Sequence, residues 1–286
     1  NKDSNNYATP SGNTTKAVAV YAVTINSNST TMGTVDTASY NVISGATYTT
    51  SGNKLTIKGI TTGTTTSDLK TITATANTGY TFSSWSSTSG KIDAKKTVTA
   101  TFTANPINFA NQTITKTFST NAQTANITAA SNGTGSYTYT EKTETNASGT
   151  ATNYITLNGT TITIAANTPA DTYTYVIVAT DNNSKVTKEA TYIIKIERAK
   201  TANAGTSDKT YNGTSQTGVT GTSVTWTGTT SAIDAGTYTA NATPDANHAW
   251  SDGTTNAKAI TWKINPKSVA VTWGTTTTFT YNGNAQ

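Results

Sequence analysis

The feature that most constrains the fold is a period-two alternation of apolar residues and Thr. Residues 72–76 and 98–102 both place an apolar side chain at every second position, with Thr between them. Successive side chains of a strand point to opposite faces of a sheet, so this pattern predicts strands with one dry and one wet face. About a quarter of all residues are Thr, whose β-branched side chain suits a pleated surface. Because no amphipathic helical pattern accompanies it, we predict an all-β fold.

The charge and composition narrow the class of protein further. Hydrophobic residues make up 34% of the chain and the net charge is only +5, whereas disordered chains usually combine low hydrophobicity with high net charge. The basic residues are scattered, so we expect no nucleic-acid partner. No run of about 20 apolar residues occurs, so we expect no membrane insertion in this segment. The absence of Cys excludes disulfides and is typical of many secreted proteins of Gram-positive bacteria.

The length of 286 residues suits two or three domains of about 100 residues each. Pro106 indicates one junction, because proline removes a ladder donor and restricts the residue before it. We also expect the sequence to be part of a longer protein. The predicted divisions are an arm or linker over 1–14, modules over 15–104, 105–198 and 199–266, and the start of a further repeat over 267–286.

The predicted first module carries an aromatic signature. Residues 79–85 read Gly-Tyr-Thr-Phe-Ser-Ser-Trp, and residues 98–102 read Val-Thr-Ala-Thr-Phe. Together they resemble the closing segments of the B-repeat modules of listerial internalins, over about residues 16–104. The resemblance implies a small β-grasp-like domain on a bacterial surface. Tyr80 and Phe82 share a strand face, and we expect Trp85 to close the end of the core.

The predicted second module contains about seven short strands in about 95 residues, separated by turns such as Asn132-Gly133. This spacing is typical of an immunoglobulin-like β-sandwich. Residues 169–176, followed by Ala-Thr-Asp at 179–181, are similar to bacterial immunoglobulin-like and cadherin-like surface repeats. We expect the strands near 114–118, 125–129, 137–139, 154–157, 161–164, 172–179 and 190–196.

The predicted third module is one copy of a tandem repeat, and the next copy starts after it. Tyr-Asn-Gly at 211–213 recurs at 281–283, 70 positions later, and a repeat of this length indicates an array. This motif and the closing Trp-Lys-Ile-Asn-Pro at 262–266 resemble the small β-repeats called MBG-type in surface proteins of Gram-positive and gut bacteria. The resemblance implies binding of mucin or another glycan.

Four of the five Trp residues lie in the last third of the chain. A Trp in register with Val or Ile is usually a core residue. An exposed Trp flanked by amides and carboxylates would instead suit a glycan. Trp250 fits that alternative best, because Asn247 and Asp252 lie close to it in sequence. The candidate ligand-binding residues are therefore Trp250, Trp226, Asn247 and Asp252, with the core interpretation left open.

The most oxygen-rich loop begins at Asp181 and Asn182, with Asp171 ten positions earlier. Calcium takes six to eight oxygen ligands, so these three residues are the candidate metal site. The same loop also suits an ordinary turn. We predict no cofactor.

Few residues are suited to catalysis. His248 is the only His, and the chain has neither Cys nor a Gly-x-Ser-x-Gly motif. Glu141 and Glu144 form an acidic pair in a polar stretch, where we expect solvent exposure instead of glycosidase chemistry. The sequence therefore favours a protein that is not an enzyme.

These observations predict a stalk or adhesive segment of a secreted bacterial repeat protein, displayed extracellularly at the cell surface or cell wall. One alternative is an adhesin module that binds a glycan or a host ligand. Another is a subunit of a self-assembling filament or surface layer. The expected partners are host or environmental glycans or proteins, the neighbouring modules and, in a filament, other copies of the chain.

Overall fold

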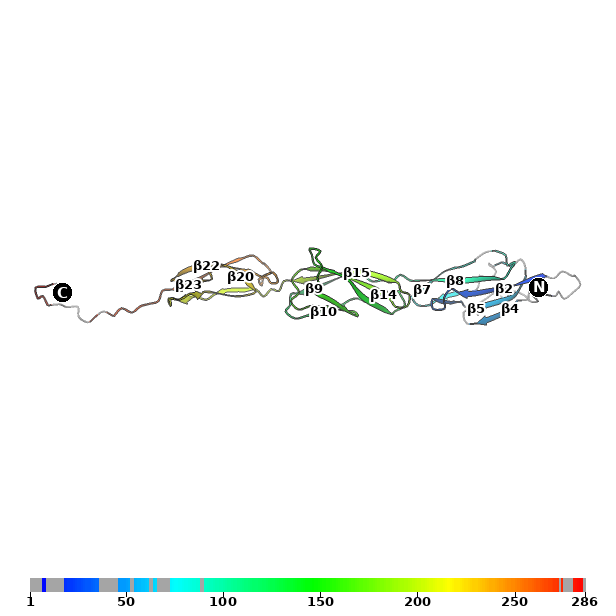
Figure 1. Cartoon of the computed structure of the whole chain (residues 1–286), viewed down its shortest axis with the longest axis horizontal. Helices are drawn as coiled ribbons and strands as arrows, with labels where there is room; N and C mark the ends of the chain where they lie inside the picture. The colour runs from blue at the N-terminus through cyan, green and yellow to red at the C-terminus, as the bar shows by residue number, and fades with distance from the viewer. Residues whose placement is uncertain are drawn as a thin grey trace. The chain divides into compact units, whose positions relative to one another are not determined.

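The computed structural model describes residues 7–8, 18–35, 46–51, 54–61, 64–65, 73–87, 90–272, 274 and 280–284. Within these residues every regular element is a strand, so the all-β prediction is confirmed. Each sheet draws its strands from one of three sets, which we call the first module (β1–β8), the second module (β9–β15) and the third module (β16–β23) (Figure 1). None of the described residues belongs to a helix that could span a membrane. Trp273 and most of the predicted arm lie outside the described residues.

The first module is a mixed sheet in the order β4-β5-β2-β8-β7, with β1 also paired to β2. β2 and β8 are parallel, whereas the other pairs in this sheet are antiparallel. The order β5-β2-β8-β7 around a parallel central pair is that of a β-grasp sheet, as the resemblance implied. β3 and β6 form a separate antiparallel pair. The strands are β1 (Tyr7–Ala8), β2 (Val18–Ser27), β3 (Gly33–Val35), β4 (Thr47–Ser51), β5 (Lys54–Thr61), β6 (Ala74–Ala76), β7 (Tyr80–Trp85) and β8 (Lys96–Ala104).

The alternation in β8 builds the core of the first module. Val98, Ala100 and Phe102 are buried on one face of the strand, with Thr residues between them. Phe82 lies edge-on to Phe102, with ring centroids 5.8 Å apart, and 5.6 Å from the ring of Trp85. Phe82 and Trp85 therefore close this core, as the aromatic signature predicted.

The second module has two sheets, in the orders β10-β13-β12 and β11-β14-β15-β9. In chain order these are strands 2-5-4 and 3-6-7-1, the arrangement of an immunoglobulin-like sandwich whose first strand joins its last. All seven predicted strands are present, with ends shifted by a few residues. The strands are β9 (Gln112–Thr117), β10 (Gln123–Asn126), β11 (Tyr137–Thr145), β12 (Ile155–Asn158), β13 (Thr161–Ile164), β14 (Thr172–Asp181) and β15 (Thr187–Glu197).

The third module contains the sheet β17-β23-β22-β20 and two separate pairs, β16-β19 and β18-β21. Trp262 on β23 is fully buried, and a Cβ on Gly218 would overlap its indole ring. The small residue therefore makes room for the large one. The strands are β16 (Asn203–Thr206), β17 (Lys209–Thr210), β18 (Gln216–Thr217), β19 (Val219–Thr222), β20 (Val224–Gly228), β21 (Ser231–Ala232), β22 (Gly236–Pro244) and β23 (Lys258–Asn265).

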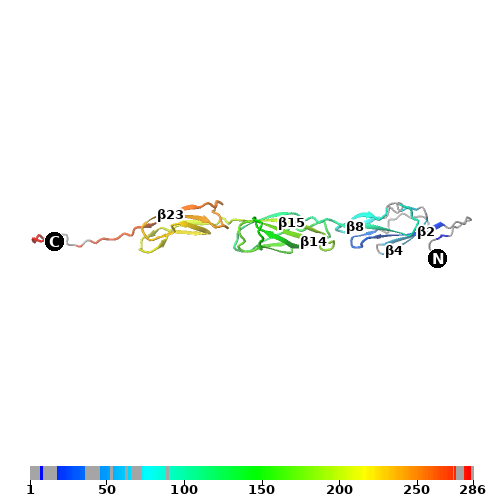
Figure 2. The ribbon, with the colours of Figure 1, turned by 45° about the horizontal axis from the view of Figure 1, so that its top comes forward.

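The chain also divides into two compact units, and residues of the second module belong to both. Figure 2 shows β14 and β15, which belong to the first unit except for the first residue of β14 and the last three residues of β15. The first unit consists of Asn1–Ile114, Gln123–Ala165 and Tyr173–Ile194, and the second of Thr115–Ala122, Ala166–Thr172 and Lys195–Gln286.

Candidate functional site

The two Trp residues of the predicted glycan platform belong to the packed interior of the third module. Trp250 is only 4% exposed, and its Nε1–H donates to the carbonyl oxygen of Asn256 at 2.8 Å. The ammonium of Lys258 lies 4.6 Å from the centroid of the Trp250 ring. Trp226 is half-buried and packs against the same apolar cluster. Of the two interpretations left open, burial favours the core for Trp250, whereas the half-buried Trp226 decides neither, and ligand binding by these residues remains a prediction.

The two polar residues predicted beside Trp250 hold loops. The Asn247 side-chain oxygen accepts a hydrogen bond from the Ala170 backbone N–H at 2.9 Å. The exposed carboxylate of Asp252 accepts from the backbone N–H and the hydroxyl of Thr254, at 2.8 and 2.6 Å. The hydrogen bond from the Thr254 hydroxyl, and to a lesser degree that from its N–H, holds the pKa of Asp252 below its usual value. Binding of a ligand by Asn247 and Asp252 remains a prediction.

The carboxylate of Asp181, predicted as a calcium ligand, is already saturated with hydrogen-bond donors. Its oxygens accept from the Thr134 N–H and hydroxyl at 2.6 and 2.8 Å, and from the Asn183 and Ser184 N–H groups at 3.0 and 2.9 Å. Burial raises the pKa of Asp181, but these four hydrogen bonds outweigh it and hold the pKa well below its usual range. Four donors facing the carboxylate repel a cation, so this arrangement speaks against the predicted calcium site.

The other two residues of the predicted calcium site are also engaged within the protein. The Asn182 side-chain oxygen accepts from the Thr138 hydroxyl at 3.1 Å, and its amide nitrogen donates to the Ser136 hydroxyl at 2.8 Å. Asp171 lies in the second compact unit, whereas Asp181 and Asn182 lie in the first. The residues described by the structure contain no cluster of three or more metal-ligating groups.

The expectation that Glu141 and Glu144 are both exposed is wrong for Glu144, which is 4% exposed. Its Oε1 accepts from the Thr152 hydroxyl and the Tyr154 N–H, and its Oε2 from the Ile155 N–H, at 2.6 to 3.1 Å. The carboxylate therefore fastens the segment that leads into β12. Glu141 is exposed and accepts from the hydroxyl of the buried Tyr175 at 3.0 Å.

His248 pairs with the carboxylate of Asp245. Its Nδ1 lies 2.6 Å from Asp245 Oδ1, and its ring lies edge-on to Phe118. Burial opposes ionisation of Asp245, but the hydrogen bond with His248 lowers its pKa. The pair anchors the loop before β23.

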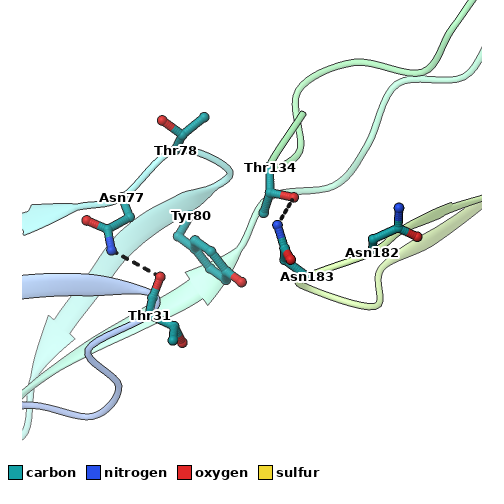
Figure 3. A pocket seen from close by; sticks show the side chains of 7 residues that line it. All are labelled: Thr31, Asn77, Thr78, Tyr80, Thr134, Asn182 and Asn183. Atoms are coloured by element: carbon teal, nitrogen blue, oxygen red, sulfur yellow. Dashed lines mark hydrogen bonds between the residues drawn. The ribbon is translucent and has the colours of Figure 1, made fainter. Parts of the chain in front are cut away.

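A polar groove of about 690 Å³ lies in the first compact unit (Figure 3). Among the described residues, three Asn, three Thr and one Tyr line it, and none of them is charged. Sequence reasoning missed this site because its walls come from turns far apart in the sequence. One wall contains Thr31, Asn77 and Tyr80, and the other contains Thr134 and Asn183.

Two amides of the groove are held in place by their nitrogen atoms. Asn77 Nδ2 donates to the carbonyl oxygens of Thr30 and Thr31 at 3.3 and 3.0 Å. Asn183 Nδ2 donates to the Thr134 hydroxyl at 3.0 Å. Among the described residues, neither amide oxygen has a hydrogen-bond donor. In Figure 3 the Tyr80 ring lies between these two amides, and no hydrogen bond is described for its hydroxyl.

A second arrangement is the parallel pairing of a strand early in a module with the last strand of the same module. In the first module five positions of β2 pair with β8, from Val23 with Lys96 to Ser27 with Ala100. The Asn28 side chain extends this ladder, since its amide accepts from the Phe102 N–H at 3.1 Å and donates to the Phe102 carbonyl oxygen at 3.4 Å.

The other two modules also contain this kind of pairing. β9 and β15, the first and last strands of the second module, are neighbours. The Thr191 N–H donates to the Asn111 side chain and the Phe118 N–H to the Glu197 carbonyl oxygen, so both strands run in the same direction. In the third module β17 follows β16 and pairs in parallel with the last strand, β23, at two positions.

Comparisons with known proteins assign no family. No family model and no curated protein matches the sequence. Solved structures with some likeness include Drosophila N-cadherin EC1-4 (8% identity, TM-score 0.32, 87% of this chain and 75% of that one) and the four N-terminal Ig domains of Dscam1 isoform 7.44 (10%, 0.30, 87% and 73%). An endo-fucoidan hydrolase of glycoside hydrolase family 107 has 10% identity and a TM-score of 0.28, and this chain spans only 42% of its length. Likenesses with TM-scores this low establish neither a family nor a function.

Proposed function

We propose that this chain is a load-bearing stalk segment of an extracellular surface protein. The observation that carries the proposal is the parallel pairing of first and last long strands, β2 with β8 and β9 with β15. The secreted, bacterial and cell-surface setting rests on the sequence resemblances to surface repeats. The Thr- and Asn-rich surface supports it, because such a surface stays hydrated without strong charge.

The geometry of a parallel pair determines how it meets a pulling force. Tension enters a module at its first strand and leaves at its last strand. When these strands are parallel neighbours, the two points of attachment lie at opposite ends of the pair, so the intervening hydrogen bonds are loaded together in shear. An antiparallel pair would have both attachments at one end, and its bonds would break one after another. The parallel arrangement therefore suits a module that must stay folded under tension.

The buried carboxylates support the same function. Asp181 and Glu144 are almost completely buried, and each accepts several hydrogen bonds from loop backbone. Charge-assisted hydrogen bonds are stronger than neutral ones, so they fasten the loops between strands. These acids act as structural anchors in the second module.

Pulling the full chain from its two ends by single-molecule force spectroscopy tests the proposal. We expect separate unfolding events whose length increments match the modules, with the first and second modules unfolding at higher force than the third. Forced unfolding depends on the unfolding rate, and so on the barrier along the pulling direction. Equilibrium stability does not measure that barrier. A single low-force extension without separate events would contradict a load-bearing role.

A further inference from the structure

We propose that the polar groove of the first compact unit binds a neutral glycan. The proposal goes beyond a stalk, because it gives the segment a ligand. It rests on the described lining residues, which combine free amide oxygens, hydroxyls and one aromatic ring in about 690 Å³. A volume of this size lies within the usual range for small-molecule sites.

The free groups of the groove match the hydrogen-bonding chemistry of a sugar. Each sugar hydroxyl donates one hydrogen bond and can accept others. The Asn77 and Asn183 side-chain oxygens are acceptors whose amide nitrogens are already committed to protein groups. The hydroxyls of Thr78 and Tyr80 can donate as well as accept. The groove thus offers acceptors for sugar hydroxyls and donors for ring or linkage oxygens.

The acceptors are fixed before a ligand arrives. Asn183 is held by Thr134, and Thr134 in turn donates two hydrogen bonds to the buried Asp181. On the other wall, the two bonds from Asn77 fix its amide against the turn at Thr30 and Thr31. A pre-ordered side chain loses less conformational entropy on binding, so it favours affinity.

The walls of the groove also approach each other closely. A Cβ on Gly79 would overlap the backbone of Gly133 and Thr134, so the turn that carries Asn77 and Thr78 lies directly against the opposite wall. Tyr80 is half-buried, with its ring between the two amides (Figure 3). A Tyr ring presents apolar area with a polar tip, which suits the C–H face of a pyranose and its hydroxyl rim.

The described lining residues carry no charge, which favours one class of glycan. An acidic sugar would require Arg or Lys to offset its desolvation, and neither is among the described lining residues. We therefore infer a neutral oligosaccharide instead of a sialylated or sulfated one.

The test is an array of neutral, sialylated and sulfated oligosaccharides probed with the full chain, followed by calorimetric titration with the strongest neutral binder. Tyr80→Ala should weaken binding by at least about tenfold, equivalent to about 1.4 kcal/mol. Asn183→Ala should weaken binding several-fold. Because Asn183 is exposed, we expect this variant to fold normally. Tyr80→Phe separates the ring from the hydroxyl and should cause a smaller loss than Tyr80→Ala.

Tyr211→Ala is the matched control, since Tyr211 is 38% exposed and lies outside the groove. It should leave binding unchanged, and thermal melts should show that all variants are folded. The proposal is overturned if no neutral oligosaccharide binds, if acidic glycans bind better, or if Tyr80→Ala and Asn183→Ala bind as well as the unaltered chain.

Discussion

The first and third modules contain the same kind of parallel strand pair but support it very differently. β2 and β8 pair at five positions, and β2 is the first long strand of its module. β17 and β23 pair at only two positions, and β16 precedes β17. Among the described residues, the first module has a cluster of ten buried residues, whereas the third has two smaller clusters of four and three. If the load-bearing proposal holds, this difference predicts that the parallel pair of the third module resists force less than that of the first, because its ladder is shorter and its core is divided.

The largest effect should come from the core of the weaker module. Trp262 is fully buried, and its Nε1–H donates to the Thr229 carbonyl oxygen at 2.8 Å. Trp262→Ala should destabilise the third module by about 3–5 kcal/mol, enough to unfold it, because it leaves a large cavity. Calorimetry should show the loss of one transition, with the others unchanged. Tyr211→Ala is the control in the same module; an equal shift of every transition would contradict independent cores.

In the second module, the buried carboxylate of Asp181 tests how much a loop anchor stabilises the fold. Asp181→Asn directs an amide NH₂ at backbone N–H donors, so it should cost about 2–4 kcal/mol at pH 7. The exposed Asp234 offers Asp234→Asn as a control, which should be nearly neutral. Chemical denaturation of both variants measures the difference.

The stability difference between the unaltered chain and Asp181→Asn should also depend on pH, in a direction that the pKa of Asp181 fixes. The folded-state pKa of Asp181 lies below its unfolded value, so its contribution is complete above about pH 4 and is lost as the pH falls toward the folded-state pKa. The stability gap between the unaltered chain and Asp181→Asn should therefore shrink on acidification below about pH 4. A gap that grows in acid would mean that the carboxylate is not the stabilising group.

A smaller effect should follow from shortening the stronger ladder. Asn28→Ala removes both side-chain hydrogen bonds to Phe102, so it should cost about 1–2 kcal/mol and lower the unfolding force of the first module. Thr103→Ala alters an exposed neighbour on β8 and should leave both quantities nearly unchanged. Equal forces for the two variants would show that the amide carries no load.

The smallest loss of stability should come from a hydrogen bond beside the β17–β23 ladder of the third module. The exposed Asp208 accepts from the Lys263 N–H at 2.9 Å, beside the β17–β23 pair. Asp208→Ala should destabilise the third module by about 0.5–1 kcal/mol, and Asp208→Asn should restore most of the loss because it keeps the acceptor oxygen. Urea unfolding of the two variants measures both losses of stability. Identical losses for Asp208→Ala and Asp208→Asn would show that the hydrogen bond to Lys263 does not stabilise the module.

The strands could be predicted from the sequence because alternation is a local signal. All seven strands of the second module follow from period-two segments and turn residues, and a β-grasp-like first module was implied by the resemblance that the aromatic signature at 79–85 carries. The parallel pairing of β2 with β8 could not be read locally, since it joins positions more than seventy residues apart.

The candidate sites were predicted less well because they depend on contacts between distant residues. Asp181 looked like a metal ligand, since its donor Thr134 lies 47 positions earlier. Glu144 looked exposed because its neighbours are polar, but it accepts from residues 8 to 11 positions later. The groove residues Asn77 and Asn183 are each unremarkable turn residues, and only the fold places them in one site.

The most direct test of the central claim compares two pulling directions on one strand pair. The chain contains no Cys, so introduced Cys residues give specific attachment points. Ala19→Cys with Ala104→Cys loads β2 and β8 in shear, whereas Ala19→Cys with Lys95→Cys pulls both strands from the same end. The shear direction should require several times the force of the peeling direction. Equal forces in both directions would contradict a load-bearing role for the parallel pair.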